Sequence, residues 1–332
     1  MLAQIDSRYI KARPSKLFSR LVSYALFEGR PLTTRGQWIN PLIFAHFTLE
    51  KHLPQLKKVE KPVFILGTGR SGTTILGIIL SMHKDVGFLN EPKAIWHSIY
   101  SKEDVIGSYD RGDARYRLDS RSVEGKTIQN AHKIFGAYLT SVFSKRLVDK
   151  YPELIFRVPF VMELFRDAQF IFLVRNGWDT CASIDKWSER LGTKKNGEVH
   201  DWWGANRRKW NLLVEQLVPE HADLMPYQED MYQWQNYTDM AALEWIITMR
   251  EGMNLERDYP NSVMRVNYEE LCQRPGDNLH QITSFLGLSH DSTFLDYGTQ
   301  VLQPARQHQP FDLAPEIKEI FEQTMRELGY LR

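Results

Sequence analysis

A glycine-rich turn between an apolar strand and an apolar helix constrains this chain more than any other stretch. Residues 63–66 predict a fully buried strand, and residues 75–82 predict an apolar helix. The turn between them, GTGRSGTT over 67–74, contains glycines that let the backbone bend tightly and approach a ligand closely. Amides at the start of a helix lack intrahelical acceptors, and the helix dipole favours negative charge there. The stretch therefore predicts an anion-binding loop in an α/β fold.

The loop departs from the usual nucleotide pattern at one position. A Walker-type loop places Lys directly after its second glycine, followed by Ser or Thr for magnesium. Here Thr73 occupies the lysine position, and the cation comes earlier, at Arg70. A kinase or other NTPase would also need an Asp at the end of a buried strand, whereas the next clear strand ends in Arg175. An ATP-dependent enzyme, or an ordinary glycine-rich connection, remains an alternative at this point.

The sequence GTGRSGTT followed by a helix resembles the 5′-phosphosulfate loop of sulfotransferases, the enzymes that use 3′-phosphoadenosine 5′-phosphosulfate (PAPS). Cytosolic members usually carry Lys in this loop, and membrane-bound and bacterial members often carry Arg. The resemblance implies PAPS as co-substrate. It also implies that the 5′-phosphosulfate is held by the loop residues Gly69, Arg70, Ser71, Gly72, Thr73 and Thr74.

Two later segments resemble the same family, so that the likeness covers roughly residues 62–330. Arg175 and Ser183 have the Arg-x7-Ser spacing of the 3′-phosphate motif, although Gly177 stands where the family usually has Pro. The run VNYEELCQRPGDNLHQITSFLGL resembles the segment whose tyrosine lies against the nucleotide, which implies this role for Tyr268. Ligands of open α/β sheets bind at the carboxyl ends of strands, where Arg175 is expected.

The resemblance also suggests a general base. Cytosolic members use a His in the segment that matches residues 156–160, which has none. Tyrosylprotein sulfotransferases instead pair an early Glu with the Lys of a Lys-x-Pro-Phe segment. This implies Glu91 as the base and Arg157, in Arg157-Val158-Pro159-Phe160, as the charge stabiliser. An unperturbed Glu is a weak base, so we expect burial to raise its pKa. His97 and His132 are alternative bases.

Composition excludes several classes of protein. The 332 residues have a net charge of +1, which gives no argument for a nucleic-acid partner. Two cysteines suggest no disulfide framework, and no stretch has the roughly 18 apolar residues of a membrane span, so a cytoplasmic enzyme is expected. Residues 1–30 are basic and mildly amphipathic; they predict a packed helix, with weak membrane-surface contact as the alternative. The scattered histidines show no metal-ligand spacing, and no metal is expected to be required.

These observations predict one α/β domain over residues 1–332. We expect a three-layer, P-loop-like fold with a central, mainly parallel sheet flanked by helices. Its strands are predicted at 63–66, 168–175 and 262–268, with a short candidate at 154–158, and a helix extends from 134 to 147. We expect a helical extension packed on the domain at 1–61 and a helical insertion that shapes the acceptor site at 187–260. A mobile loop is expected at 192–199.

The expected reaction is transfer of the sulfuryl group from PAPS to a hydroxyl by in-line displacement. The aromatic content of residues 93–130 and 187–240 favours a small apolar or ring-bearing acceptor, such as a lipid, a sterol-like compound or a natural-product alcohol. A carbohydrate and a peptide tyrosine are the alternative acceptors. A non-catalytic nucleotide-binding protein of the same fold is a further alternative, and the sequence predicts no oligomeric state.

Overall fold

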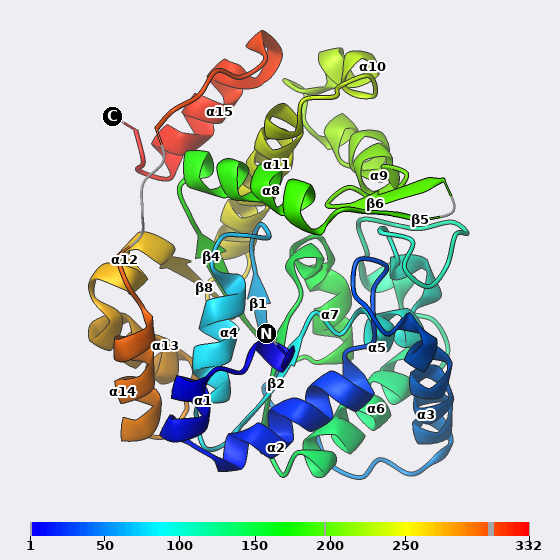
Figure 1. The fold of residues 1–332 in the computed structure, drawn as a ribbon, viewed down its shortest axis with the longest axis vertical. Coiled ribbons are helices and arrows are strands. Elements are labelled where there is room, and N and C mark those ends of the chain that lie inside the picture. The colour runs from blue at the N-terminus through cyan, green and yellow to red at the C-terminus, as the bar shows by residue number, and fades with distance from the viewer. Residues whose placement is uncertain (1, 196, 305–308, 332) are drawn as a thin grey trace.

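The centre of the molecule is a parallel sheet, described here from a computed structural model that covers residues 2–195, 197–304 and 309–331 (Figure 1). Within these ranges the sheet has five strands in the order β2-β3-β1-β4-β8, and every neighbouring pair is parallel. The strands are β1 Val63–Leu66, β2 Val86–Asn90, β3 Arg146–Lys150, β4 Gln169–Val174 and β8 Val263–Asn267. The predicted fold class, an α/β fold with a central parallel sheet, is confirmed.

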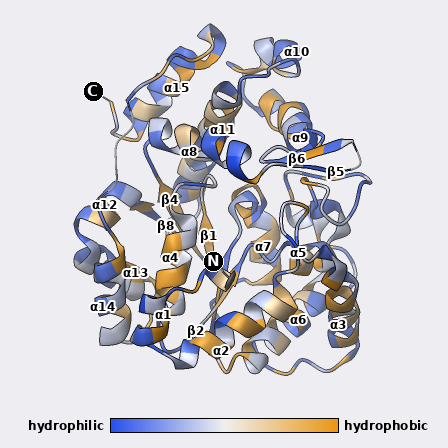
Figure 2. Cartoon of the chain, viewed as in Figure 1, coloured by the Kyte–Doolittle hydropathy of each residue, from blue (hydrophilic) through white to orange (hydrophobic). Residues whose placement is uncertain are grey.

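Helices cover both faces of the sheet and give the molecule three layers. Val63 and Ile65 of β1 pack into one apolar cluster, and Phe64 and Leu66 pack into the other, because successive side chains of a strand point to opposite faces. Figure 2 shows hydrophobic colouring along β1 and α4 at the centre of the molecule. One face is covered by α4 Thr73–Ser81, α12 Tyr268–Gln273, α13 Pro275–Leu286 and α14 Ser292–Val301. The other is covered by α5 Lys93–Ile99, α6 Thr127–Ser141, α7 Val158–Leu164, α8 Gly177–Leu191, α11 Tyr237–Asp258 and α15 Pro315–Glu327.

Two of the five strands were not expected, and one expected strand is absent from its place. The helix predicted up to residue 147 ends at Ser141, and β3 begins at Arg146 after a turn with positive φ at Phe143. The predicted strand at 154–158 is wrong: a 3₁₀ helix, Pro152–Arg157, runs directly into α7. Proline at the start of each helix explains the difference, since its fixed φ suits the first helical turn.

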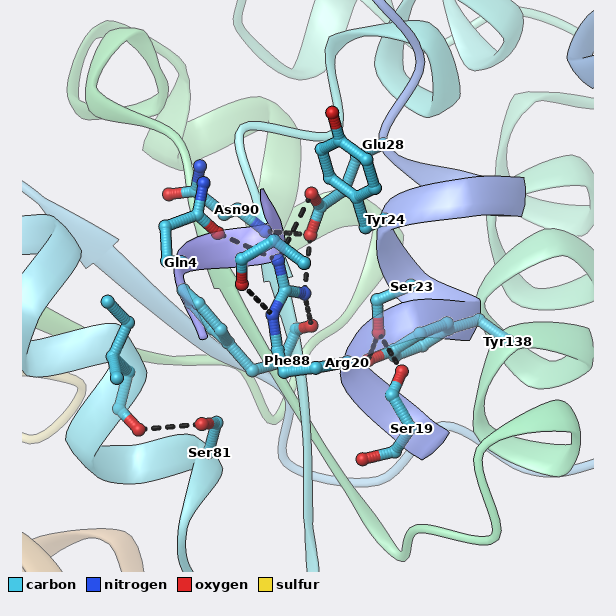
Figure 3. A network of polar contacts seen from close by, with 12 residues as sticks. Gln4, Ser19, Arg20, Ser23, Tyr24, Glu28, Ser81, Phe88, Asn90 and Tyr138 are labelled. Carbon is cyan, nitrogen blue, oxygen red and sulfur yellow. Dashed lines mark hydrogen bonds and ion pairs between the residues drawn. The ribbon is translucent and has the colours of Figure 1, made fainter. Parts of the chain in front are cut away.

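The N-terminal helices α1 Ser7–Ala12, α2 Ser15–Val22 and α3 Asn40–His52 pack on this core. A buried ion pair joins them to the sheet, with Arg20 Nη1 2.6 Å from Glu28 Oε1 and 3.0 Å from the Phe88 carbonyl (Figure 3). Glu28 also accepts from the Asn90 N–H at 2.8 Å. The pair therefore fixes the carboxyl end of β2. Within the described ranges, no helix is both long and apolar enough to cross a membrane.

The segment expected to be a mobile loop at 192–199 forms most of an antiparallel hairpin instead. β5 Thr193–Lys195 pairs with β6 Glu198–Asp201, which also pairs with β7 Gly204–Ala205; residue 196 lies outside the described residues. Polar residues occupy most of this hairpin, including the buried His200 and Asp201, so the hairpin lacks the apolar alternation that marks a strand in sequence. Two helices follow, α9 Arg208–Gln216 and α10 Gln228–Met231, on the same side of the molecule as α8 (Figure 1).

Candidate active site

The glycine-rich loop leaves β1 and enters α4 in a conformation that requires glycine at two positions. Gly67 and Gly72 have φ values of 135° and 99°. A Cβ on Gly72 would lie 2.3 Å from the Tyr268 ring, and one on Gly67 would lie 2.5 Å from the Leu173 carbonyl oxygen. Both distances are far below van der Waals contact, so the end of β4 and the start of α12 enclose the loop from two sides.

The loop offers hydrogen-bond donors that an anion can use. The Thr68 Oγ1 and Ser71 Oγ atoms are buried, and neither has a hydrogen-bond partner in the part of the chain that the structure describes. Buried hydroxyls are normally paired, so two unpaired ones in one loop are available to hold an anionic ligand. Because α4 begins directly after Gly72, its first amides face the same loop. These donors fit the phosphosulfate end of PAPS.

The structure brings four of the predicted nucleotide residues together beside this loop. Arg70 Nε donates to Ser183 Oγ at 3.1 Å, and Arg175 Nη1 donates to the Arg70 carbonyl at 3.0 Å. The Arg175 guanidinium also lies 4.8 Å from the centroid of the Tyr268 ring. Burial and the nearby charges of Arg175 and Arg190 lower the pKa of Arg70. The crowded positive charges favour an anion at this position.

Glu91 follows β2 in a left-handed turn with φ 50° and is held by Lys150 at the end of β3. Its backbone N–H donates to the Lys150 carbonyl at 2.7 Å, and the Lys150 ammonium donates to Glu91 Oε1. Lys93 Nζ lies 3.7 Å from Glu91 Oε2. The carboxylate side chain remains 37% exposed.

The electrostatics of Glu91 differ from the expectation. Burial by itself would raise the pKa of Glu91. The charges of Lys150 and Lys93 together outweigh burial and lower this pKa to about 2. The expected upward shift is therefore wrong. Glu91 is an ionised carboxylate whose charge is balanced by two lysines.

Arg157 lies elsewhere, which corrects the assignment of the cation beside Glu91. Its side chain is 1% exposed, and its guanidinium donates to Glu103 Oε2 and the Glu103 carbonyl, both at 2.8 Å. Lys150 is the cation that donates a hydrogen bond to Glu91, and Lys93 also lies beside it. The sequence contained a signal for Lys150, since Lys150-Tyr151-Pro152 also has Lys-x-Pro spacing.

Glu91 lines a cavity whose empty space, including open solvent at its entrance, is about 640 Å³. Gly69 of the loop lines the same cavity, and so do Trp187 and Trp202, whose rings lie edge to face at 5.4 Å. Other tryptophans of the region belong to the core, namely Trp203, Trp210 and Trp245. The cavity therefore joins the anion loop, the candidate base and an aromatic wall supplied by residues 187–260.

The two alternative histidine bases are not among the described residues that line this cavity. His97 packs against the Phe44 and Tyr109 rings, and His132 Nε2 lies 2.9 Å from the Leu164 carbonyl. His200 does line the cavity, but its Nε2 pairs with Glu198 at 3.0 Å. Its position depends on the hairpin, which the sequence did not reveal.

The family model described as "Sulfotransferase family" matches residues 62–292, which is more than half of the chain. The chain therefore belongs to the sulfotransferase family. The match begins one residue before β1 and ends at the start of α14, so it includes the loop, Glu91, Lys150 and the Arg175–Ser183 motif.

Two relatives of this chain illustrate the low sequence identity of its matches. Protein-tyrosine sulfotransferase 2 of Gallus gallus is 23% identical over 260 residues, which cover 76% of this chain and 58% of the relative. Protein-tyrosine sulfotransferase A of Caenorhabditis elegans is 22% identical over 246 residues, which cover 71% of this chain and 52% of the relative. The chain thus spans little more than half of either relative.

Solved structures resemble the fold at similarly low identity. Sulfotransferase STF9 from Mycobacterium avium has a TM-score of 0.48 and 11% identity, covering 98% of this chain and 92% of its own. The sulfotransferase domain from the curacin biosynthetic pathway has a TM-score of 0.47 and 15% identity, covering 83% of this chain and all of its own.

Proposed function

We propose that this chain transfers the sulfuryl group of PAPS to a hydroxyl of an acceptor held beside Glu91. The observation that carries the proposal is that Gly69, in the anion loop, and Glu91 line the same cavity. A donor held by the loop and an acceptor held in the cavity would meet there. Holding two reactants in line supplies much of the rate enhancement for such displacements.

On the donor side, the loop residues 69–74 would hold the 5′-phosphosulfate, with Arg70 as the cation. Arg175 and Ser183 would hold the 3′-phosphate, and Tyr268 would lie against the nucleotide. Bound PAPS supplies the sulfuryl group and leaves as 3′-phosphoadenosine 5′-phosphate. Arginine suits the phosphate because its planar guanidinium donates two parallel hydrogen bonds.

On the acceptor side, Glu91 would accept the hydroxyl proton. A carboxylate with a pKa of about 2 is a poor base toward a free alcohol. The hydroxyl becomes strongly acidic as its oxygen bonds to sulfur, so we infer that the proton moves late in the displacement. Lys150, hydrogen-bonded to Glu91, would orient the carboxylate and stabilise the negative charge near the transferred group.

The acceptor we propose is a small ring-bearing alcohol. Trp187 and Trp202 line the cavity that would hold it. The cavity also contains charged groups, so an entirely apolar acceptor such as a simple lipid alcohol fits less well than the sequence suggested. A peptide tyrosine is the second candidate, because relatives of this chain are named protein-tyrosine sulfotransferases.

Transfer of label from radioactive PAPS to a panel of phenols, sterols, sugars and a tyrosine peptide tests the proposal. We expect PAPS-dependent labelling of at least one ring-bearing alcohol by the wild-type protein. The exposed Glu163 of α7 provides a control, so Glu163→Gln should label the same acceptor normally while Glu91→Gln should not. Equal labelling by both variants would remove Glu91 from the mechanism.

A further inference from the structure

We propose that Glu153 binds a second hydroxyl of the acceptor, so that the preferred acceptor is a ring-bearing diol or polyol and not a simple alcohol. The inference rests on the proposed function, because it assigns the substrate class of the same cavity. Glu153 would act as an acceptor-binding residue that sets specificity, while Glu91 receives the proton.

The first observation is the placement of two carboxylates around one ammonium. Glu153 lies in the 3₁₀ helix that follows β3, and both Glu153 and Glu91 line the cavity. Lys93 Nζ lies 3.5 Å from Glu153 Oε1 and 3.7 Å from Glu91 Oε2. Because one nitrogen lies close to both carboxylates, a single small molecule can reach both of them.

The second observation is that Glu153 retains unused hydrogen-bonding capacity. Glu244 also lines the cavity, but both of its oxygens are paired, with Lys209 at 2.5 Å and with Trp202 Nε1 at 2.7 Å. The Glu153 side chain is 7% exposed, and its Oε2 has no hydrogen-bond partner within residues 2–195, 197–304 and 309–331. A buried charged oxygen without a partner is costly, so a donor that reaches Oε2 from the cavity would stabilise the carboxylate.

The charge of the surroundings selects the partner. Burial by itself would raise the pKa of Glu153, but the charges of Lys93 and Lys209 together outweigh burial and lower this pKa. The carboxylate is therefore ionised and only accepts hydrogen bonds. The ligand group must therefore be a donor. The same two lysines repel an ammonium, and Glu91 repels an anion, which leaves a neutral hydroxyl as the group that fits best.

The ring of the proposed acceptor follows from the aromatic lining of the cavity. Trp187 and Trp202 line the cavity and can pack against the face of a flat or chair-shaped ring. Two neighbouring hydroxyls on such a ring project from one edge, toward Glu91 and Glu153. This combination matches an aromatic diol or a cyclic polyol.

Calorimetric titration with matched probes tests the assignment in the presence of saturating 3′-phosphoadenosine 5′-phosphate. The pairs are catechol with phenol, and trans-1,2-cyclohexanediol with cyclohexanol, which differ only in the second hydroxyl. In the wild type and in Glu163→Gln we expect at least one diol to bind about 10-fold or more tightly than its partner, as for a hydrogen bond to a charged group. Glu153→Leu should lose the preference, and Glu153→Gln should keep part of it.

The proposal is overturned if neither diol is preferred by the wild type, including the case in which no probe binds, or if Glu153→Leu keeps the preference. Thermal unfolding identifies a variant that fails to fold, and Glu153→Gln then decides between the outcomes. The nucleotide titration on the same sample separates two failures. Nucleotide binding without diol preference removes only the role of Glu153, whereas absence of nucleotide binding contradicts the proposed sulfotransferase activity.

Discussion

The Lys150 ammonium donates a hydrogen bond to the Glu91 carboxylate, and the Glu91 backbone N–H donates in return to the Lys150 carbonyl. The two residues meet because β2 and β3 are parallel neighbours in which Asn90 is paired with Lys150. The carboxyl ends of two sheet strands therefore position the candidate base and its cation. A site built on strands holds its geometry more tightly than one built on long loops.

Replacement of Glu91 by Gln should prevent the side chain from accepting the hydroxyl proton, while the size and shape of the side chain stay nearly the same. We expect turnover to fall by roughly 10²–10⁴-fold, the usual range for loss of a general base. Affinity for 3′-phosphoadenosine 5′-phosphate should change little, because the proposed nucleotide residues lie in the loop and at Arg175 and Ser183. Steady-state kinetics and calorimetry on the same preparations check both statements, and full turnover in Glu91→Gln would contradict the assignment.

Removal of Lys150 should shift the pH dependence of the reaction. In Lys150→Met, Glu91 loses the cation and the hydrogen bond that help to lower its pKa to about 2, so its pKa should rise toward the usual 4.5, with Lys93 still close. The acidic limb of kcat/KM against pH should therefore move to higher pH, and kcat should fall. Lys145→Met is a control, since Lys145 is exposed and pairs with Asp85. Coincident acidic limbs in Lys150→Met and wild type would contradict the pairing.

The stability of the fold should depend on Glu91 in a defined pH window. The pKa of Glu91 is lower in the folded state than in the unfolded chain. Glu91 therefore contributes stability that is complete above about pH 4.5 and is lost as the pH falls to about 2. Glu91→Gln removes this contribution. Chemical unfolding between pH 5 and pH 2 should show the wild type losing more stability than Glu91→Gln. Parallel pH profiles would mean that the lysines do not stabilise the ionised carboxylate.

A side chain at Gly72 should destroy the anion loop. Gly72→Ala places a Cβ in contact with the Tyr268 ring and in a backbone conformation that alanine disfavours. We expect nucleotide affinity to fall by at least about 10-fold, the equivalent of roughly 1.4 kcal/mol. Gly276→Ala is the matched control, because a Cβ there meets no atom within 4 Å in the described structure. Unchanged nucleotide affinity in Gly72→Ala would exclude the loop from binding.

Local patterns in the sequence were sufficient to select the residues that the structure brings together in the proposed nucleotide site. The glycines of the loop, and Arg175 at the end of an apolar strand, are visible as short motifs whose geometry follows from backbone chemistry. The strand β1 and its loop were predicted at nearly their observed bounds for this reason.

The acceptor side depends on contacts between distant residues and could not be predicted in the same way. β3 contains Arg146, Asp149 and Lys150, so it lacks the apolar pattern of a buried strand. Burial raises the pKa of Asp149, and Trp96 Nε1 donates to its carboxyl at 2.8 Å, a partner 53 residues away. With β3 unrecognised, the register that brings Lys150 to Glu91 was also hidden, and Arg157 was assigned in its place.

Calorimetric titration of the purified protein with 3′-phosphoadenosine 5′-phosphate, beside ATP with magnesium, tests the central claim most directly. The proposed donor site predicts tight binding of the former without metal, weakened in Arg70→Ala and Arg175→Ala, and little binding of the latter. Preferential binding of magnesium ATP would contradict the proposed sulfuryl transfer.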